Sequence, residues 1–226
     1  MFFYRHILIL IILYFCTASS YAQGEYLQDG TNGFEIDGNL SGYSYSGNFS
    51  LGYGGKIGYS VEGVFDMCLE LSRFNDDSSQ STEGAHMTTY FPYIVFHLAK
   101  YNHFGHPLGL SFLIGYTKST YSADDNEIVV TSEPGRFQAG FLLYQNLMKS
   151  PDWTFQPNFE ILFKKDPGGN SVFKLNSTIK LGIAAYIKMG KNRRRVLKIG
   201  PSIGFSGDYT IIEVKAGVLW PFASLR

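Results

Sequence analysis

The sequence predicts an all-β protein: a closed antiparallel up-and-down transmembrane β-barrel of about ten strands. Three observations lead to this prediction. Apolar and polar residues alternate through most of the chain, the alternating segments are long, and few residues are charged. Charged residues make up 17% of the chain, whereas globular proteins average about 25%. Because aromatic residues reach 16% and glycines number 25, the surface of the folded chain need not be very polar.

Residues 1–22 have the features of a secretory signal peptide. A basic start is followed by an apolar core over residues 7–16 and a small-x-small cleavage site over residues 20–22. The apolar run is shorter than the roughly 20 residues that a membrane-spanning helix needs. We therefore expect residues 23–226 to form the exported barrel domain.

The composition argues against several classes of ligand. The chain has 19 basic and 19 acidic residues and no strongly basic patch, so we expect no nucleic-acid partner. Cys68 is the single cysteine after the signal peptide, which rules out a disulfide within residues 23–226. No zinc-ligand spacing and no phosphate-binding glycine loop occurs, so we expect neither a metal nor a cofactor.

The stretch DWTFQPNFEILFK at 152–164 shows the alternation clearly. Successive side chains of a strand point to opposite faces, so one face of this segment is apolar and the other is polar. Leu162 alone breaks the rule on the polar face. The apolar face holds Trp153, Phe155, Pro157, Phe159, Ile161 and Phe163.

Ten strands are expected from this pattern. Most contain about ten residues or more, the length that a tilted strand needs to cross a bilayer, whereas strands of globular proteins typically have about 5–6 residues. Eight strands are the alternative if the first hairpin does not join the barrel. In the segment 87–99 both faces are apolar, so its orientation is ambiguous. The expected strands are 33–44, 47–61, 64–74, 87–99, 108–119, 135–146, 152–164, 172–189, 196–206 and 209–222.

The connections differ between the two ends of the expected barrel. Those near residues 62, 103, 149 and 192 are fairly short, and basic residues gather in them. The connections after residues 74 and 119 are long and polar, and acidic residues gather there. Outer-membrane barrels have short periplasmic turns and longer extracellular loops, which is the same asymmetry.

Alternation alone does not decide which face is outward. A soluble sandwich or a lipocalin-like barrel would bury the apolar face and expose the polar face to water. Because the strands are long and carry few charges, the exposed surface of such a protein would consist largely of Gly, Ser and Thr, which argues against a soluble fold. The apolar face also ends in aromatic residues, as interfacial girdles do. We therefore expect this face to contact lipid and the barrel to close, because unpaired backbone groups in lipid are costly. The predicted aromatic girdle is Tyr59, Tyr116, Trp153, Trp220 and Phe222.

The polar face then lines the lumen. Seven bases and four acids fall on it, which predicts a mildly positive interior. One interpretation is a network of salt bridges that fills a narrow barrel, and the other is a small water-filled pathway with a weak anion preference. Barrels of about eight strands are filled by side chains, so ten strands leave little room. The predicted lumen charges are Lys56, Asp66, Glu70, Glu160, Lys164, Lys174, Lys180, Lys188, Lys198, Glu213 and Lys215.

Three prolines lie in the middle of expected strands, on the outward face: Pro92, Pro157 and Pro201. A closed barrel has no free edge where a missing N–H donor would be harmless. We therefore expect bulges or local breaks in the ladder at these positions.

Three segments, GNFSLGYGGKIGYSV, FDMCLELSRF and IIEVKAGVLWPF, together resemble the porin-like outer-membrane β-barrel protein family of didermic bacteria. The resemblance covers essentially all of 33–222. It implies an integral protein of the outer membrane that is inserted by the barrel-assembly machinery and contacts lipid and lipopolysaccharide. The last segment resembles the terminal assembly signal of such barrels, although four residues follow its final aromatic. That signal comprises Val214, Ala216, Val218, Trp220 and Phe222.

We find no convincing catalytic constellation. A barrel lipid deacylase needs a serine activated by a histidine that a carboxylate orients. The lipid A deacylase family is reported to carry a histidine two residues before its serine, and no His-x-Ser occurs here. His97 falls on the inward face, where filling of the lumen is the preferred interpretation over a general base. His103 and His106 lie in a short turn without an obvious third metal ligand.

Two loops carry acidic residues that could serve other chemistry. A barrel protease needs paired acids and a histidine near the outer rim, and Asp76, Asp77 and His86 are the nearest candidates; we interpret them as solvated loop residues. The second loop carries three acids that are weaker candidates for calcium or for cations bound to lipopolysaccharide: Asp124, Asp125 and Glu127.

The sequence thus favours an integral outer-membrane barrel without enzymatic activity, with a structural or surface-interaction role through its polar extracellular loops. A narrow porin for small solutes or ions is the first alternative, and an outer-membrane lipid-modifying enzyme is the second. The extracellular partner and the oligomeric state stay open.

Overall fold

The computed structural model describes residues 31–45, 48–76, 85–99, 108–123, 129–132, 135–145, 148–149, 152–165, 175–190, 195–207 and 209–223. The expected signal peptide at 1–22 lies outside these residues. Within the described part of the chain, no helix is long and apolar enough to cross a membrane.

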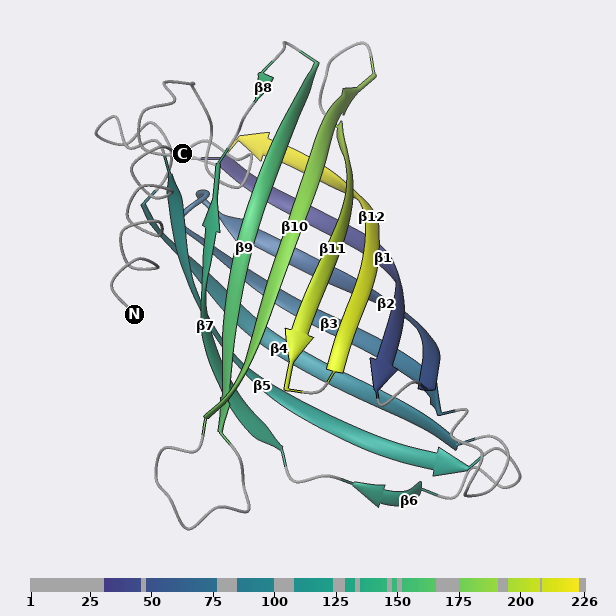
Figure 1. Ribbon diagram of the computed structural model, residues 1–226. Helices are drawn as coiled ribbons and strands as arrows, with labels where there is room; N and C mark the ends of the chain where they lie inside the picture. Colours follow the sequence, from purple (N-terminus) through teal and green to yellow (C-terminus); the bar gives the residue numbers. More distant parts are fainter. Residues whose placement is uncertain are drawn as a thin grey trace, which may run out of the picture.

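The described residues form ten long strands and two short ones (Figure 1). The short strands are β6 (Val129–Ser132), which pairs with β5, and β8 (Met148–Lys149), which pairs with β9. The long strands are β1 (Thr31–Tyr45), β2 (Asn48–Val61), β3 (Phe65–Asp76), β4 (Ala85–Ala99), β5 (Gly109–Ala123), β7 (Arg136–Tyr144), β9 (Trp153–Lys165), β10 (Leu175–Met189), β11 (Arg195–Ser206) and β12 (Tyr209–Ala223).

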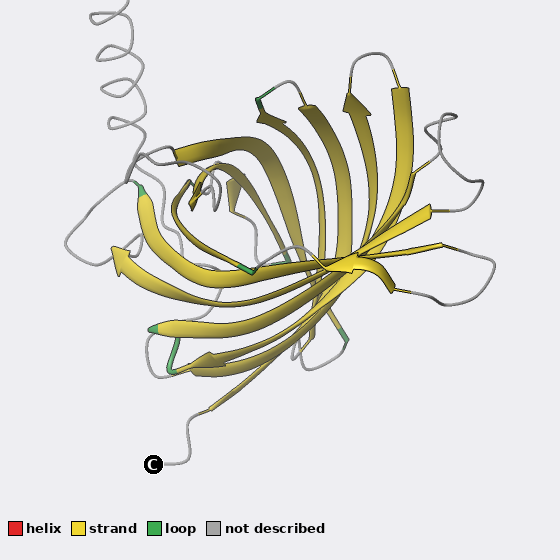
Figure 2. Cartoon of the chain, turned by 90° about the horizontal axis from the view of Figure 1, so that it is seen from below, coloured by secondary structure: helices red, strands yellow, loops and turns green. Residues whose placement is uncertain are grey.

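The ten long strands close into a ring. Each pairs antiparallel with the long strands before and after it in the chain, and β1 pairs with β12 from Thr31↔Ala223 to Tyr45↔Tyr209. The strands are tilted and curve around a common interior (Figures 1 and 2). The prediction of ten strands in an up-and-down barrel is therefore confirmed, and the first hairpin joins the barrel along its whole length.

The two faces of the wall differ as the alternation predicted. Large apolar side chains are exposed on the outer face, with Leu40 at 70% and Leu51 at 63%. Polar side chains on the inner face are buried, with Asp37 at 4% and Ser111 at 0% exposure. The apolar face is therefore outward, and a soluble sandwich, in which that face would be buried, is excluded.

The ambiguous segment becomes β4, and it is apolar on both faces because its inward side chains join an apolar cluster inside the barrel. Val95 packs against Leu113 of β5 and Leu162 of β9, with Phe91 and Tyr93 beside them. This cluster also explains Leu162, the one apolar residue on the polar face of β9.

The three mid-strand prolines coincide with interruptions of the ladder. The β4–β5 pairing skips Pro92 between Tyr90↔Lys118 and Tyr93↔Gly115, without a change of register. The β10–β11 pairing skips Pro201 in the same way. Beside Pro157, β7 ends and the neighbouring strand resumes as β8. Each proline keeps its pairing on the other side, so a local break is enough to accommodate the missing donor.

Candidate functional site

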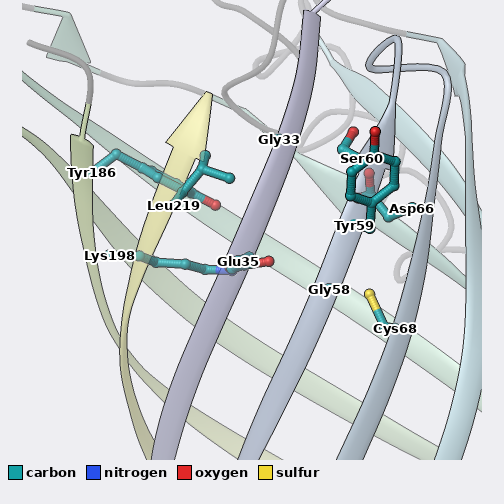
Figure 3. A pocket seen from close by; sticks show the side chains of 10 residues that line it. All are labelled: Gly33, Glu35, Gly58, Tyr59, Ser60, Asp66, Cys68, Tyr186, Lys198 and Leu219. Carbon is teal, nitrogen blue, oxygen red and sulfur yellow. The ribbon is translucent and has the colours of Figure 1, made fainter. Parts of the chain in front are cut away.

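The most distinctive group of side chains is a set of ion pairs inside the barrel, centred on Glu35 of β1. Its two carboxylate oxygens lie 2.7 Å from Lys56 Nζ on β2 and 3.0 Å from Lys198 Nζ on β11. Asp37, the next inward residue of β1, lies 3.1 Å from Lys56 Nζ and 3.9 Å from Lys198 Nζ. Figure 3 shows the Lys198 side chain extended toward Glu35. Two acids and two bases therefore neutralise one another in the low-dielectric interior.

Glycines on the neighbouring strands make room for these polar side chains. Gly217 of β12 pairs with Asp37, and a Cβ at Gly217 would overlap the Asp37 carboxylate. Gly54 of β2 pairs with Asn39, and a Cβ there would lie 2.5 Å from Asn39 Oδ1. The inward glycines thus let the side chains of β1 lie flat against the wall.

A second group of ion pairs extends this network toward the extracellular end and across the lumen. Glu213 of β12 accepts a hydrogen bond of 2.7 Å from Asn39 Nδ2, and it lies 3.7 Å from Lys180 Nζ of β10. Lys215 Nζ lies 3.5 Å from both Glu213 and Glu70. Because Glu70 belongs to β3, the Lys215–Glu70 pair links strands that are separated by β1 and β2.

Glu35 and Asp37 correct the predicted charge balance of the lumen. Four acids and seven bases are predicted for the interior, and these two carboxylates raise the number of acids to six. The excess of bases is therefore smaller than the sequence indicated. The signal was present in GFEIDGNLS, where Phe34, Ile36 and Leu40 alternate with polar residues, but the glycines of this segment weakened the pattern.

A serine, a histidine and an aspartate meet at the periplasmic end of the lumen. His97 Nδ1 lies 2.9 Å from Ser111 Oγ, and His97 Nε2 lies 3.0 Å from Asp66 Oδ2. The residue types are those of a hydrolase triad, and sequence inspection missed them because they come from three strands. Ser111 has no exposed surface. The arrangement ties β3, β4 and β5 together.

The backbone near His97 is also tied to the turn between β2 and β3. The His97 N–H donates to the Val64 carbonyl at 2.9 Å. One residue later the β4–β5 register shifts, between His97 and Ala99, and Leu98 at the shift is 60% exposed. This is a bulge in a position where no proline occurs, and the sequence pattern did not predict it.

The remaining predicted lumen charges lie on the other strands of the wall. Glu160 of β9 pairs in register with Lys180, and Lys164 pairs with Gln138 of β7. Lys188 of β10 lies near the periplasmic end, opposite Val196. Lys174 lies outside the described residues.

A small cavity lies between the first ion pairs and the periplasmic end (Figure 3). Its accessible volume is about 20 Å³, which is room for roughly one water molecule. Glu35, Lys198, Asp66 and the buried Ser60 line it together with Tyr186 and Leu219, so polar and apolar side chains share its walls.

Aromatic rings line the other end of the lumen. Tyr43 of β1 lies with its ring centroid 4.9 Å from that of Tyr209 and 5.8 Å from that of Phe74. These residues continue the inward positions of β1, β12 and β3. Aromatic side chains therefore narrow the lumen at the end where the long loops connect the strands.

The predicted girdle residues are on the outer face. Tyr59, Trp153 and Phe222 are 37–44% exposed near the periplasmic end, and Tyr59 and Phe222 have ring centroids 6.1 Å apart. Trp220 lies beside Phe34 at 6.0 Å. Tyr116 lies toward the opposite end, at 5.3 Å from Phe137.

The predicted assembly signal occupies the outward positions of β12, the strand that closes the ring. Of its residues, Val214 and Phe222 are 47% and 44% exposed, and Phe222 pairs in register with Asn32. The members of this set are Val214, Ala216, Val218, Trp220 and Phe222.

The other candidate residues are placed only in part. His86 lies at the extracellular end of β4, where its Nδ1 is 3.0 Å from Asn75 Oδ1. Asp76 ends β3, and nothing is described of its side chain. In the described part of the chain, no three His, Cys, Asp or Glu side chains gather to hold a metal ion. The residues outside the described ranges are Asp77, His103, His106, Asp124, Asp125 and Glu127.

The fold and its two faces define the class of protein. Closed barrels satisfy all backbone groups between strands and can therefore cross lipid. Here the exposed wall is apolar, the charged side chains are inside, and the ring closes. These are the features of outer-membrane barrels, and the protein is an integral β-barrel protein of the outer membrane.

No family model matches the sequence, and no curated protein matches it. Among solved structures, the chain is similar to the β domain of the Bordetella autotransporter BrkA, at 11% identity over 85% of this chain and 100% of that chain, with a TM-score of 0.48. It is also similar to the translocator domain of the autotransporter NalP from Neisseria meningitidis, at 11% identity over 85% and 88%, with a TM-score of 0.45. The chain is similar as well to the Ail protein of Yersinia pestis, at 11% identity over 86% of this chain and 100% of that chain, with a TM-score of 0.36. Similarity at this level does not assign a function.

Proposed function

We propose that the protein is a non-enzymatic outer-membrane barrel whose lumen is filled, and that it has a structural or surface-interaction role through its extracellular loops. Its partners on this proposal are the lipid and lipopolysaccharide of the outer membrane, the barrel-assembly machinery during insertion, and an extracellular partner at the loops.

The observation that carries the proposal is the Lys215–Glu70 pair, which joins β12 to β3 at 3.5 Å inside the lumen. The network around Glu35 and Glu213 lies on the same side of the interior, and the apolar cluster of Val95, Leu113 and Leu162 adds to the filling on the side of β4, β5 and β9. With ten strands there is little space left beside these side chains.

Conductance across a planar bilayer tests the filled lumen. Folded protein inserted from detergent is expected to give no steps in current, because no continuous water path crosses the ion pairs. The inserted fraction is measured in parallel by protease protection in vesicles. Regular steps from inserted wild-type protein would contradict the proposal.

A narrow pore is the second candidate, and one group of atoms favours it. Asp37, Asn39 and Ser41 succeed one another along the inner face of β1, and each has a buried side-chain oxygen without a hydrogen-bond partner in the described structure. Buried polar atoms usually bind water. If these waters form a continuous file, wild-type vesicles will show water or proton permeation even when no ion current is measured.

The absence of enzymatic activity is tested separately at His97 and His86. The lipopolysaccharide of cells that produce the wild-type protein is compared by mass spectrometry with that of cells producing His97→Ala or His86→Ala. Identical mass profiles, also relative to cells without the protein, are expected. A mass change that only the wild type produces would identify the protein as a lipid-modifying enzyme.

A further inference from the structure

The outer face of the barrel has a polar, cationic region at its extracellular end, across β3, β4 and β5. In Figure 1 these strands run side by side to the lower right, where β6 lies beside β5. Arg73 of β3 pairs in register with Thr88 of β4, and Lys118 of β5 pairs with Tyr90 of β4. We call this group of four residues the β3–β5 rim.

Alternation along the strands places the rim side chains on the outside. Leu71 and Tyr116, two residues closer to the membrane centre on β3 and β5, are 42% and 38% exposed. Between them on β4, Tyr90 is 44% exposed. The intervening residue Thr89 faces inward, where its hydroxyl lies 3.0 Å from that of Ser119. Arg73 and Lys118 therefore lie at the boundary between the apolar wall and the head groups.

The charges of the rim are not neutralised by the described part of the chain. Neither Arg73 nor Lys118 has an ion-pair partner among the described residues, and no acidic residue shares the outward face of β3, β4 and β5 at this end within those residues. Thr88, Tyr90 and Thr120 add hydroxyl groups to the same surface. The chemical character is that of a site for an anion that also carries hydroxyl groups.

The same end of β1, β2 and β11 is different, although β2 adjoins β3. The large outward side chains there are apolar: Leu40 at 70%, Phe49 at 57%, Leu51 at 63% and Phe205 at 46% exposure. At this end the outward side chains described on these three strands carry no cation, so Arg73 and Lys118 do not belong to a basic ring around the whole barrel. A local pair of cations fits a site for one lipid molecule better than a general attraction to anionic head groups.

We infer that the β3–β5 rim binds a phosphate group of lipopolysaccharide in the outer leaflet. Strands lie about 4.8 Å apart and rise about 3.4 Å per residue. Arg73 and Lys118 are two strands and two register positions apart, so their Cα atoms are separated by roughly 12 Å. Their long side chains can converge on one phosphate or hold two phosphates of the same head group, with the Arg73 guanidinium suited to bidentate contact. Sugar hydroxyls would then meet the hydroxyl groups of the rim. The inference rests on the proposed contact with lipopolysaccharide and specifies the site.

The test uses the folded full-length protein in nonionic detergent and purified rough-type lipopolysaccharide as the probe. Binding is measured by native mass spectrometry and by titration at two salt concentrations. The double variant Arg73→Gln/Lys118→Gln is expected to bind at least tenfold more weakly than the wild type and to have a smaller salt dependence. The matched control is Arg195→Gln, an exposed outward cation at the periplasmic end of β11, which is expected to bind as the wild type does.

Two further arms identify the source of the phosphate. Dephosphorylated lipopolysaccharide is expected to bind the wild type as weakly as intact lipopolysaccharide binds the double variant. Phosphatidylglycerol micelles are expected to show no difference between wild type and double variant. Heat-modifiable gel mobility confirms that each variant is folded, and the charge-conserving variant Arg73→Lys/Lys118→Arg is expected to retain most of the binding.

Three outcomes would overturn the inference. The first is an unchanged affinity of the double variant for lipopolysaccharide. The second is a loss of affinity in Arg195→Gln as large as that in the double variant. The third is an equally large loss of phosphatidylglycerol binding in the double variant, which would mean a general phospholipid contact. None of these results depends on conductance or on lipopolysaccharide mass, so the filled, non-enzymatic barrel could stand while this site failed.

Discussion

At the scale of single residues, the interior is built by pairing large polar side chains with glycines on the adjacent strand. Asp37 lies over Gly217 and Asn39 lies over Gly54. A strand position without a side chain usually weakens a sheet, but here it provides the space that two buried polar groups need. The glycines therefore contribute to the ion-pair network without carrying any charge.

This role predicts a specific defect for Gly217→Ala. The new Cβ would overlap the Asp37 carboxylate and lie 2.5 Å from the Ile36 backbone oxygen, and overpacking of this kind costs about 1–3 kcal/mol. The urea midpoint of the folded barrel in vesicles should fall. Gly38→Ala is the matched control, because its Cβ would point outward with no neighbour closer than 3.9 Å. An equal midpoint for both variants would refute the packing argument.

At the scale of the strands, ion pairs connect adjacent strands and also strands that the backbone ladder does not pair. Glu35 joins β1 to β2 through Lys56 and, across β12, to β11 through Lys198. Hydrogen bonds between adjacent strands determine the order of strands in the ring, whereas the ion pairs between non-adjacent strands hold the wall at a set distance across the lumen.

Removal of one charge from this group should be costly. Glu35→Gln leaves Lys56 and Lys198 with Asp37 as their remaining acid, and breaking a buried pair costs about 3–5 kcal/mol. We expect a lower urea midpoint and faster hydrogen exchange of β1. The added substitution Lys198→Met should recover part of the loss, because one buried base is then removed. Glu62→Gln, at an exposed turn residue, serves as the control, and a shift as large as that of Glu35→Gln would contradict the expectation.

At the scale of the whole molecule, closure depends on β12, which completes the ring with β1 along fifteen residues. The predicted assembly signal lies on the outward face of this strand. We predict that insertion depends on this surface, which on the proposed function the assembly machinery recognises before the barrel closes.

Phe222→Ser should reduce insertion more than it reduces stability. Phe222 is the last aromatic of the signal, and its ring contacts Tyr59 at a centroid distance of 6.1 Å. The fraction of protein with the heat-modifiable mobility of the folded form should fall severalfold in outer-membrane preparations. Phe205→Ser changes an aromatic residue of similar exposure, 46%, at the opposite end of β11. If both variants insert equally well, the signal has no special role in this chain.

Much of the fold could be predicted because lipid selects a simple pattern. A strand that contacts hydrocarbon on one face and a narrow lumen on the other must alternate residue by residue, so the strands and the outward apolar face are readable without coordinates. The break at each proline follows from a missing donor. The bulge after His97 could not be predicted in this way, because no residue type in YFPYIVFHLAK indicates a bulge there.

The sequence by itself determined the ten strands, the outward apolar face and most of the inward charges, since each of these depends on residues close together in the chain. Only the tertiary structure decided how those charges are paired. Glu35 with Lys198, Lys215 with Glu70, and His97 with Asp66 and Ser111 come from different strands, and which of them meet depends on the register and closure of the whole ring. The same holds for the cations of the β3–β5 rim, which share a surface only because β4 lies between them.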